Sequence, residues 1–230
     1  MSIKHISAII FWGAFWGLEE ATLGHLLHIT TFNLGWFLWF PFAYFFMSMV
    51  YKQTGKLNSI LFTSMVAIAI KLVNLLMTTN LIIVICPAIS ILLEGISLMA
   101  VLKLFAWQKH LHQPKLLEIT IISLFWRILY TVSILAIPVW IMPAYPYKTI
   151  TAIVKFLLYE GLVNSIFIYG TIMLVNKTNA MLEEKHACLI TYFKLFREIL
   201  TNSSVFKDIT FKPLASFSLL VIALIIQWVL

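Results

Sequence analysis

Charged residues are scarce in this sequence: Asp, Glu, Lys and Arg together account for 11% of its 230 residues. Hydrophobic residues account for 62%, which is more apolar surface than a water-soluble domain of this length can bury. The alternating segments of about 10 residues that a transmembrane barrel requires are also missing. The composition therefore excludes a soluble domain and predicts an all-α integral membrane protein.

Motifs for nucleotide hydrolysis and for common hydrolases are lacking as well. There is no G-x-x-x-x-G-K-[ST] segment, no G-x-S-x-G and no H-E-x-x-H. Glu19 and Glu20 match the first two positions of the E-E-x-x-x-R motif of intramembrane CAAX-type proteases, but Gly24 stands where that motif has arginine. The chain therefore has no ATPase motif of its own, and we assign no catalytic residue.

Apolar segments divide the chain. Seven are present, at residues 6–28, 33–51, 58–78, 82–105, 116–141, 149–175 and 213–230. We predict a six-span bundle within residues 1–175, a cytoplasmic loop over 176–212, and a seventh span at 213–230 that is barely long enough to cross. In the loop, Leu189, Phe193, Phe196 and Leu200 recur at helical spacing. This spacing predicts an amphipathic helix on the inner leaflet, either as a simple link or as a docking surface for a cytoplasmic partner.

The distribution of Lys and Arg predicts the orientation. With the N-terminus inside, the cytoplasmic segments hold twelve of these residues, whereas the outer loops hold only Lys148. Cytoplasmic loops carry an excess of positive charge, so we expect a cytoplasmic N-terminus and an external C-terminus. The two cysteines, Cys86 and Cys188, then fall on opposite sides of the membrane, and no disulfide is expected between them.

Polar side chains within the predicted spans are the candidate functional residues. Each charged group in hydrocarbon costs at least about 2.5–3.5 kcal/mol, so such groups face the bundle interior or an aqueous cavity. Four are acidic and three are basic, which permits pairing. With two asparagines, the set is Glu19, Glu20, Lys71, Asn74, Glu94, Arg127, Lys155, Glu160 and Asn164.

The depth of these residues indicates where a cavity would open. The first and third spans run outward and carry their polar residues past the midpoint. Those of the fourth, fifth and sixth spans lie near the middle or toward the outside. Salt bridges that serve only packing need not be so one-sided. We therefore predict a polar cavity open to the exterior, with ion pairs for packing alone as the alternative.

One face of the first span carries small residues beside a charge. Its members follow one another at spacings of three or four: Gly13, Gly17, Glu20, Gly24 and His28. The glycines allow a neighbouring helix to approach closely, and Glu20 could pair with Lys71 or Arg127. Eight residues separate Glu20 from His28, about 12 Å along a helix, so they cannot share one metal ion without a kink. We place His28 at the cavity mouth and assign no metal and no cofactor.

Two stretches resemble a known family. "AFWGLEEATLGHLLH" at 14–28 and "CPAISILLEGISLMAVLKLF" at 86–105 are similar to the membrane-embedded S-component families of energy-coupling-factor (ECF) transporters, over about residues 6–175. The resemblance implies a small six-span protein that captures vitamins or related micronutrients from outside. It also implies a transmembrane coupling protein and two cytoplasmic ATPases as partners. The family's helix-one A-x-x-x-A docking motif is absent, and Gly13-x-x-x-Gly17 is its nearest equivalent.

The main hypothesis is therefore the substrate-binding membrane subunit of a micronutrient importer in a prokaryotic cell membrane, not an enzyme. Mixed charge suits a small polar or zwitterionic ligand. The predicted ligand-binding residues are Glu20, His28, Lys71, Asn74, Glu94, Arg127, Glu160 and Asn164. The alternatives are a stand-alone proton- or ion-coupled carrier and an intramembrane enzyme acting on a lipid substrate.

Overall fold

The computed structural model describes residues 2–29, 35–76, 81–105, 114–136, 149–182 and 210–229, and every regular element in these ranges is helical. The all-α prediction is confirmed for this part of the chain. The elements are α1 (Ile3–Ile29), α2 (Gly35–Thr54), α3 (Leu57–Leu72), the 3-10 turn η1 (Val73–Leu76), α4 (Leu81–Leu104), α5 (Leu116–Leu135), α6 (Ile150–Val154), the π-helical segment η3 (Lys155–Glu160), α7 (Gly161–Leu182) and α10 (Pro213–Val229).

Four of the described helical segments are long and apolar enough to cross a membrane: Leu57–Leu76, Val84–Leu104, Leu116–Leu135 and Ile150–Leu174. The count of six spans plus a seventh stays a prediction, as does the cytoplasmic N-terminus. The last helix, α10, is apolar but shorter, with 17 residues.

The predicted amphipathic helix around Leu189–Leu200 lies outside the described residues. The loop was predicted to begin at 176, but α7 continues to Leu182, which is seven residues past the predicted end of the sixth span.

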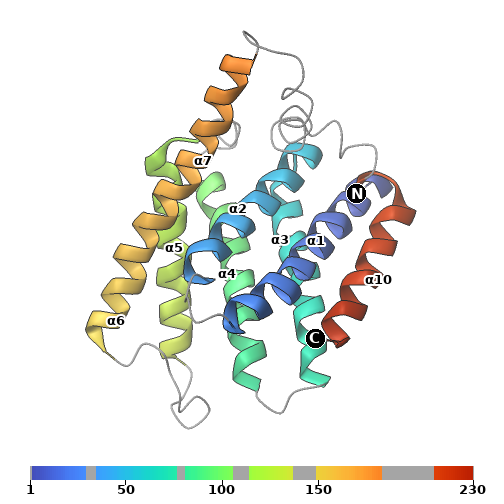
Figure 1. Cartoon of the computed structure of the whole chain (residues 1–230), viewed down its shortest axis with the longest axis horizontal. Coiled ribbons are helices and arrows are strands. Elements are labelled where there is room, and N and C mark those ends of the chain that lie inside the picture. The colour runs from blue at the N-terminus through green and yellow to red at the C-terminus, as the bar shows by residue number, and fades with distance from the viewer. Residues whose placement is uncertain are drawn as a thin grey trace.

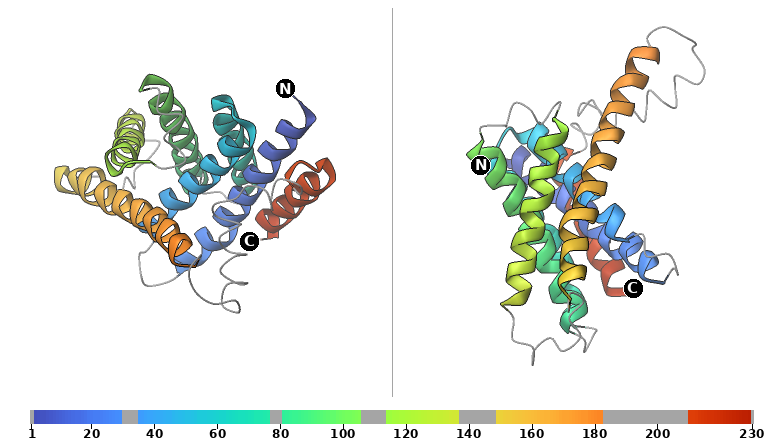
Figure 2. Two further views of the ribbon diagram at one scale, coloured as in Figure 1. Left: turned by 90° about the horizontal axis from the view of Figure 1, so that it is seen from above. Right: turned by 90° about the vertical axis from the view of Figure 1, so that its left-hand side faces the viewer.

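The helices form a curved row with one helix across it. In the row, α10 lies beside α1, α1 beside α3, α3 beside α4, α4 beside α5, and α5 beside α7. Seen from above in Figure 2, α2 crosses the inside of this curve, where it contacts α1, α3, α4 and α7. Figure 1 shows α1 and α10 running in the same direction, as expected for a first and a seventh span.

An aromatic core fills the junction of α1 and α2. Trp12 is perpendicular to Phe45, with ring centroids 6.0 Å apart, and Trp16 is stacked on Phe46 at 6.3 Å. The buried indole of Trp12 donates a hydrogen bond from Nε1 to Gln53 Oε1 at 2.9 Å. Burial of these large rings stabilises the packing of α2 against α1. It thereby fixes the position of the residues that follow Trp16 on α1 relative to α2.

The glycines of α1 bring α3 unusually close, as the sequence predicted. A Cβ on Gly13 would lie 2.6 Å from Val66 Cβ, and one on Gly17 would lie 2.6 Å from Ile70 Cδ1. Gly13 pairs with Val66 and Gly17 with Ile70, so the two helices run in parallel in register. The opposite side of α1 is covered by α10, where Ala223 packs in one cluster with Ala14 and Ile70. The glycine face of α1 is therefore buried within the chain.

Candidate functional site

Glu20 and Lys71 form the first contact of the candidate site. The in-register approach of α1 and α3 puts Glu20, one turn beyond Gly17, beside Lys71, one residue beyond Ile70. Glu20 Oε2 lies 4.0 Å from Lys71 Nζ, and the two side chains are 12% and 14% exposed. The predicted pairing of Glu20 is thus with Lys71 and not with Arg127.

Glu94 approaches this pair from α4. Glu94 is only 4% exposed, and its Oε1 accepts a hydrogen bond from Ser90 Oγ, one turn away, at 3.1 Å. Glu94 also interacts electrostatically with Glu19 on α1. Glu94 interacts electrostatically with Glu20 and also with Arg127.

Glu19 is the buried carboxylate that the sequence-based site omitted. It is 7% exposed, and neither carboxylate oxygen has a hydrogen-bond partner among the described residues. It interacts electrostatically with Glu20, Glu94 and Lys71, so it lies in the same cluster. Sequence reasoning favoured Glu20 because that residue shares the glycine face. The adjacency of Glu19 to Glu20 in an otherwise apolar segment was the sequence signal that could have included Glu19.

Arg127 is buried among hydrogen-bond partners and aromatic rings. It is 1% exposed, and its Nε donates a hydrogen bond to the Phe156 carbonyl oxygen at 3.0 Å. Its Nη1 donates to Ser123 Oγ at 2.9 Å. The guanidinium carbon lies 4.5 Å from the ring centroid of Trp126, 5.2 Å from that of Phe156 and 5.9 Å from that of Phe40. Arg127 therefore braces the junction of α5, η3 and α2, and ligand binding by this residue stays a prediction.

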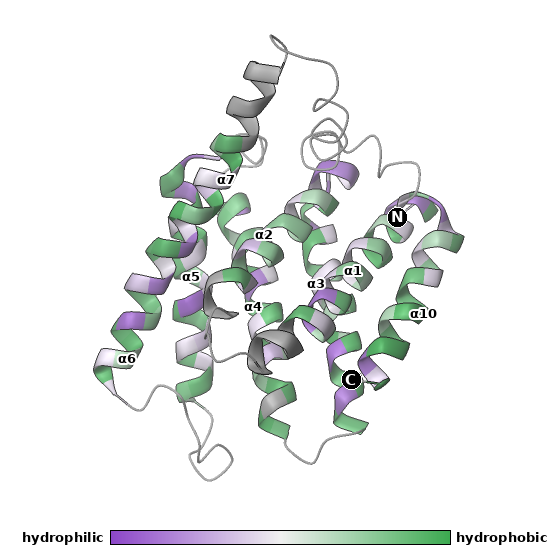
Figure 3. Ribbon diagram, in the orientation of Figure 1, coloured by the Kyte–Doolittle hydropathy of each residue, from purple (hydrophilic) through white to green (hydrophobic). Residues whose placement is uncertain are grey.

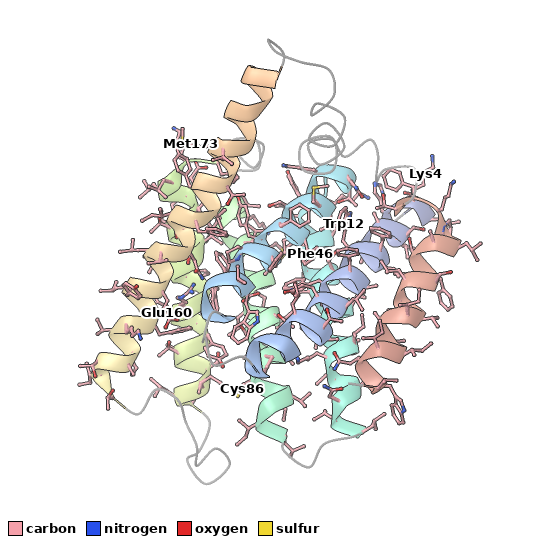
Figure 4. The ribbon with its side chains drawn as sticks, in the orientation of Figure 1. Lys4, Trp12, Phe46, Cys86, Glu160 and Met173 are labelled. Carbon is pink, nitrogen blue, oxygen red and sulfur yellow. The ribbon has the colours of Figure 1, made fainter. Side chains whose placement is uncertain are left out.

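The π-helical segment η3 carries two further charges. Glu160, labelled in Figure 4, interacts electrostatically with Arg127 and with Lys155 at the other end of η3. The α5 side chains hold η3 at both ends, because Arg127 binds the Phe156 carbonyl and Ser123 Oγ donates to the Gly161 carbonyl at 3.1 Å. Short π-helical turns within α-helices are frequent at functional sites.

Three predicted ligand-binding residues remain, and they are Asn74, Asn164 and His28. Asn74 is half-buried in η1, one turn after Lys71. Asn164 is fully buried on α7, one turn after Glu160. The backbone of His28 belongs to the last turn of α1, but its side chain lies outside the described residues.

The charged residues form two groups that meet at Arg127. The first, on α1, α3 and α4, contains Glu19, Glu20, Lys71 and Glu94, and we call it the acidic group. The second, on α5 and η3, contains Arg127, Lys155 and Glu160. Figure 3 shows hydrophilic bands interrupting the apolar helices partway along their length. The electrostatic interaction of Glu94 with Arg127 connects the two groups.

These features define an all-helical protein with helices able to cross a membrane and with ionisable side chains gathered between them. Comparison of the chain with protein-family models, curated proteins and solved structures gives no match.

Proposed function

We propose that this chain is the substrate-binding membrane subunit of a micronutrient importer, with a polar site open to the exterior. The observation that carries the proposal is the unpartnered carboxylate of Glu19 inside a group of charges from separate helices. Ion pairs that serve packing alone are not expected to leave a buried carboxylate without a hydrogen bond. Burying such a carboxylate costs on the order of several kcal/mol. A site in which a bound ligand pairs with Glu19 accounts for such a residue.

The proposed partners follow from the resemblance to S components. A transmembrane coupling protein and cytoplasmic ATPases would supply the energy for inward release. The arrangement of α1 restricts where the coupling protein can bind. Because Gly13 and Gly17 face Val66 and Ile70, the nearest equivalent of the family's docking motif is already occupied by α3. Another surface of the bundle would serve for docking.

Binding of a micronutrient to the purified full-length chain tests this function. We expect a vitamin panel in titration calorimetry to include a ligand whose affinity falls at least about tenfold in Glu94→Gln, since loss of a buried charged contact costs about 2 kcal/mol or more. Glu118→Gln is the matched control, because the Glu118 carboxylate caps the start of α5 through the Lys115 backbone amide. Absence of any ligand on the panel, or full affinity in both Glu20→Gln and Glu94→Gln, contradicts the proposal.

A stand-alone ion-coupled carrier is the second candidate, and Glu19 also favours it. A buried carboxylate near two others can exchange a proton during transport. Uptake by the isolated chain in liposomes under a pH gradient supports the carrier, whereas uptake that needs added coupling protein and ATPases supports the importer subunit.

The lipid-modifying enzyme is less well supported. It requires a carboxylate within hydrogen-bond reach of a second acid or base. Glu19 lies near Glu20 and Glu94, but its oxygens form no hydrogen bond with either one.

A further inference from the structure

The acidic group is unbalanced in charge. It holds three carboxylates, those of Glu19, Glu20 and Glu94, against the single ammonium of Lys71. In their ionised form these carboxylates repel one another strongly, because the medium between apolar helices screens charge poorly. A bound positive charge would relieve this repulsion. This reasoning rests on the proposed function and asks which class of ligand the site accepts.

The partners of the three carboxylates show where such a charge would bind. Glu20 has Lys71 at 4.0 Å, and Glu94 accepts a hydrogen bond from Ser90 and interacts with Arg127. Glu19 is more than nine-tenths buried, and within the part of the chain that the structure describes both of its oxygens lack hydrogen-bond partners. Glu19 is therefore the carboxylate of the acidic group that a bound cation would contact.

The surroundings of Glu19 suit an organic cation better than a metal ion. No group of three or more His, Cys, Asp and Glu side chains in the described residues is arranged to hold a metal, and calcium needs six to eight converging oxygen ligands. Trp16 lies one turn before Glu19 on the same face of α1. Its indole is fully buried and stacked on Phe46, and its Nε1 donor has no acceptor. Organic ammonium and amidinium groups donate hydrogen bonds to carboxylates and are also attracted to aromatic rings.

We propose that the site takes an organic monocation with N–H donors, an amine or an amidine, whose charged group binds the Glu19 carboxylate beside Trp16. The positive end of the ligand then lies toward α1 and α4. A zwitterionic ligand fits only with its anionic end directed away from the acidic group.

Benzamidine and benzamide test this inference because they share one shape and differ in charge. We expect titration calorimetry on the full-length chain to show benzamidine binding at least about tenfold more tightly than benzamide. Glu19→Gln should remove the preference, whereas Glu118→Gln should keep it. Glu19→Gln is expected to fold, because it replaces a buried carboxylate without a partner by a neutral group of the same shape.

Several results would overturn the inference. These are binding of neither probe, equal binding of both, an unchanged preference in Glu19→Gln, and binding of sodium in place of benzamidine. A neutral micronutrient that binds with full affinity to Glu19→Gln but weakly to Glu94→Gln also overturns it, while the importer proposal stands. Conversely, a preference for benzamidine with no micronutrient bound on the panel keeps the cation site and contradicts the importer.

Discussion

Gly17→Leu is expected to be among the most damaging single substitutions in the bundle. A Cβ at this position would lie 2.6 Å from Ile70 Cδ1 and 2.9 Å from Ile70 Cβ, so that α1 and α3 must separate. Overpacking of this kind costs about 3 kcal/mol. The separation also moves Glu20, one turn beyond Gly17, away from Lys71, the residue after Ile70. Thermal unfolding of the detergent-purified protein measures the loss.

The control for this substitution is Gly170→Leu, because a Cβ on Gly170 would have no atom within 4 Å. We expect that variant to unfold close to the temperature of the original chain. Adding Ile70→Ala to Gly17→Leu should restore part of the lost stability, since it removes the atoms that clash. Equal unfolding temperatures for Gly17→Leu and Gly170→Leu would show that α1 and α3 are not in close contact.

Arg127→Leu is expected to destabilise the chain by about 3–5 kcal/mol, the usual result of removing a buried charged group with its hydrogen bonds. The substitution leaves the Phe156 carbonyl without the Arg127 donor and removes the cation from the rings of Trp126 and Phe156. The π-helical segment η3 would lose its main side-chain contact with α5. Thermal unfolding and the fraction of monodisperse protein after purification measure the effect.

Arg127→Lys separates the charge of this residue from its geometry. Lysine keeps the positive charge but cannot present the planar set of donors that binds Phe156 and Ser123 together. We therefore expect it to recover only part of the stability that Arg127→Leu loses. If Arg127→Leu were as stable as the original chain, Arg127 would not brace α5 against η3, and a direct contact with ligand would become the better interpretation.

The helical class was predictable because long apolar segments in a chain with few charges have no other stable arrangement in a membrane. The spacing of Gly13 and Gly17 predicted that a neighbouring helix would approach α1 closely, but it did not predict that this helix would be α3. Helix ends were less predictable, and α7 continues to Leu182 because Asn176, Lys177 and Thr178 do not stop a helix by themselves.

The detailed roles of the charged residues were not predictable from local sequence. Glu19 and Glu20 are adjacent, and which one pairs with Lys71 depends on the rotation of α1 against α3. The aromatic surroundings of Arg127 come from Phe40 on α2 and Phe156 on η3, which are distant in sequence. Likewise, η3 follows from tertiary contacts of α5 and has no composition signal of its own.

Accessibility of the acidic group to water from outside is the central claim, and cysteine labelling measures it directly. In a chain with Cys86→Ser and Cys188→Ser, Glu19→Cys and Glu94→Cys are treated in intact cells with a membrane-impermeant methanethiosulfonate. Ile128→Cys is the matched control, because Ile128 is next to Arg127 in α5 but is 48% exposed on the apolar outside of the bundle. We predict rapid labelling at 19 and 94 and none at 128. No labelling at 19 or 94 from the outside would contradict the account.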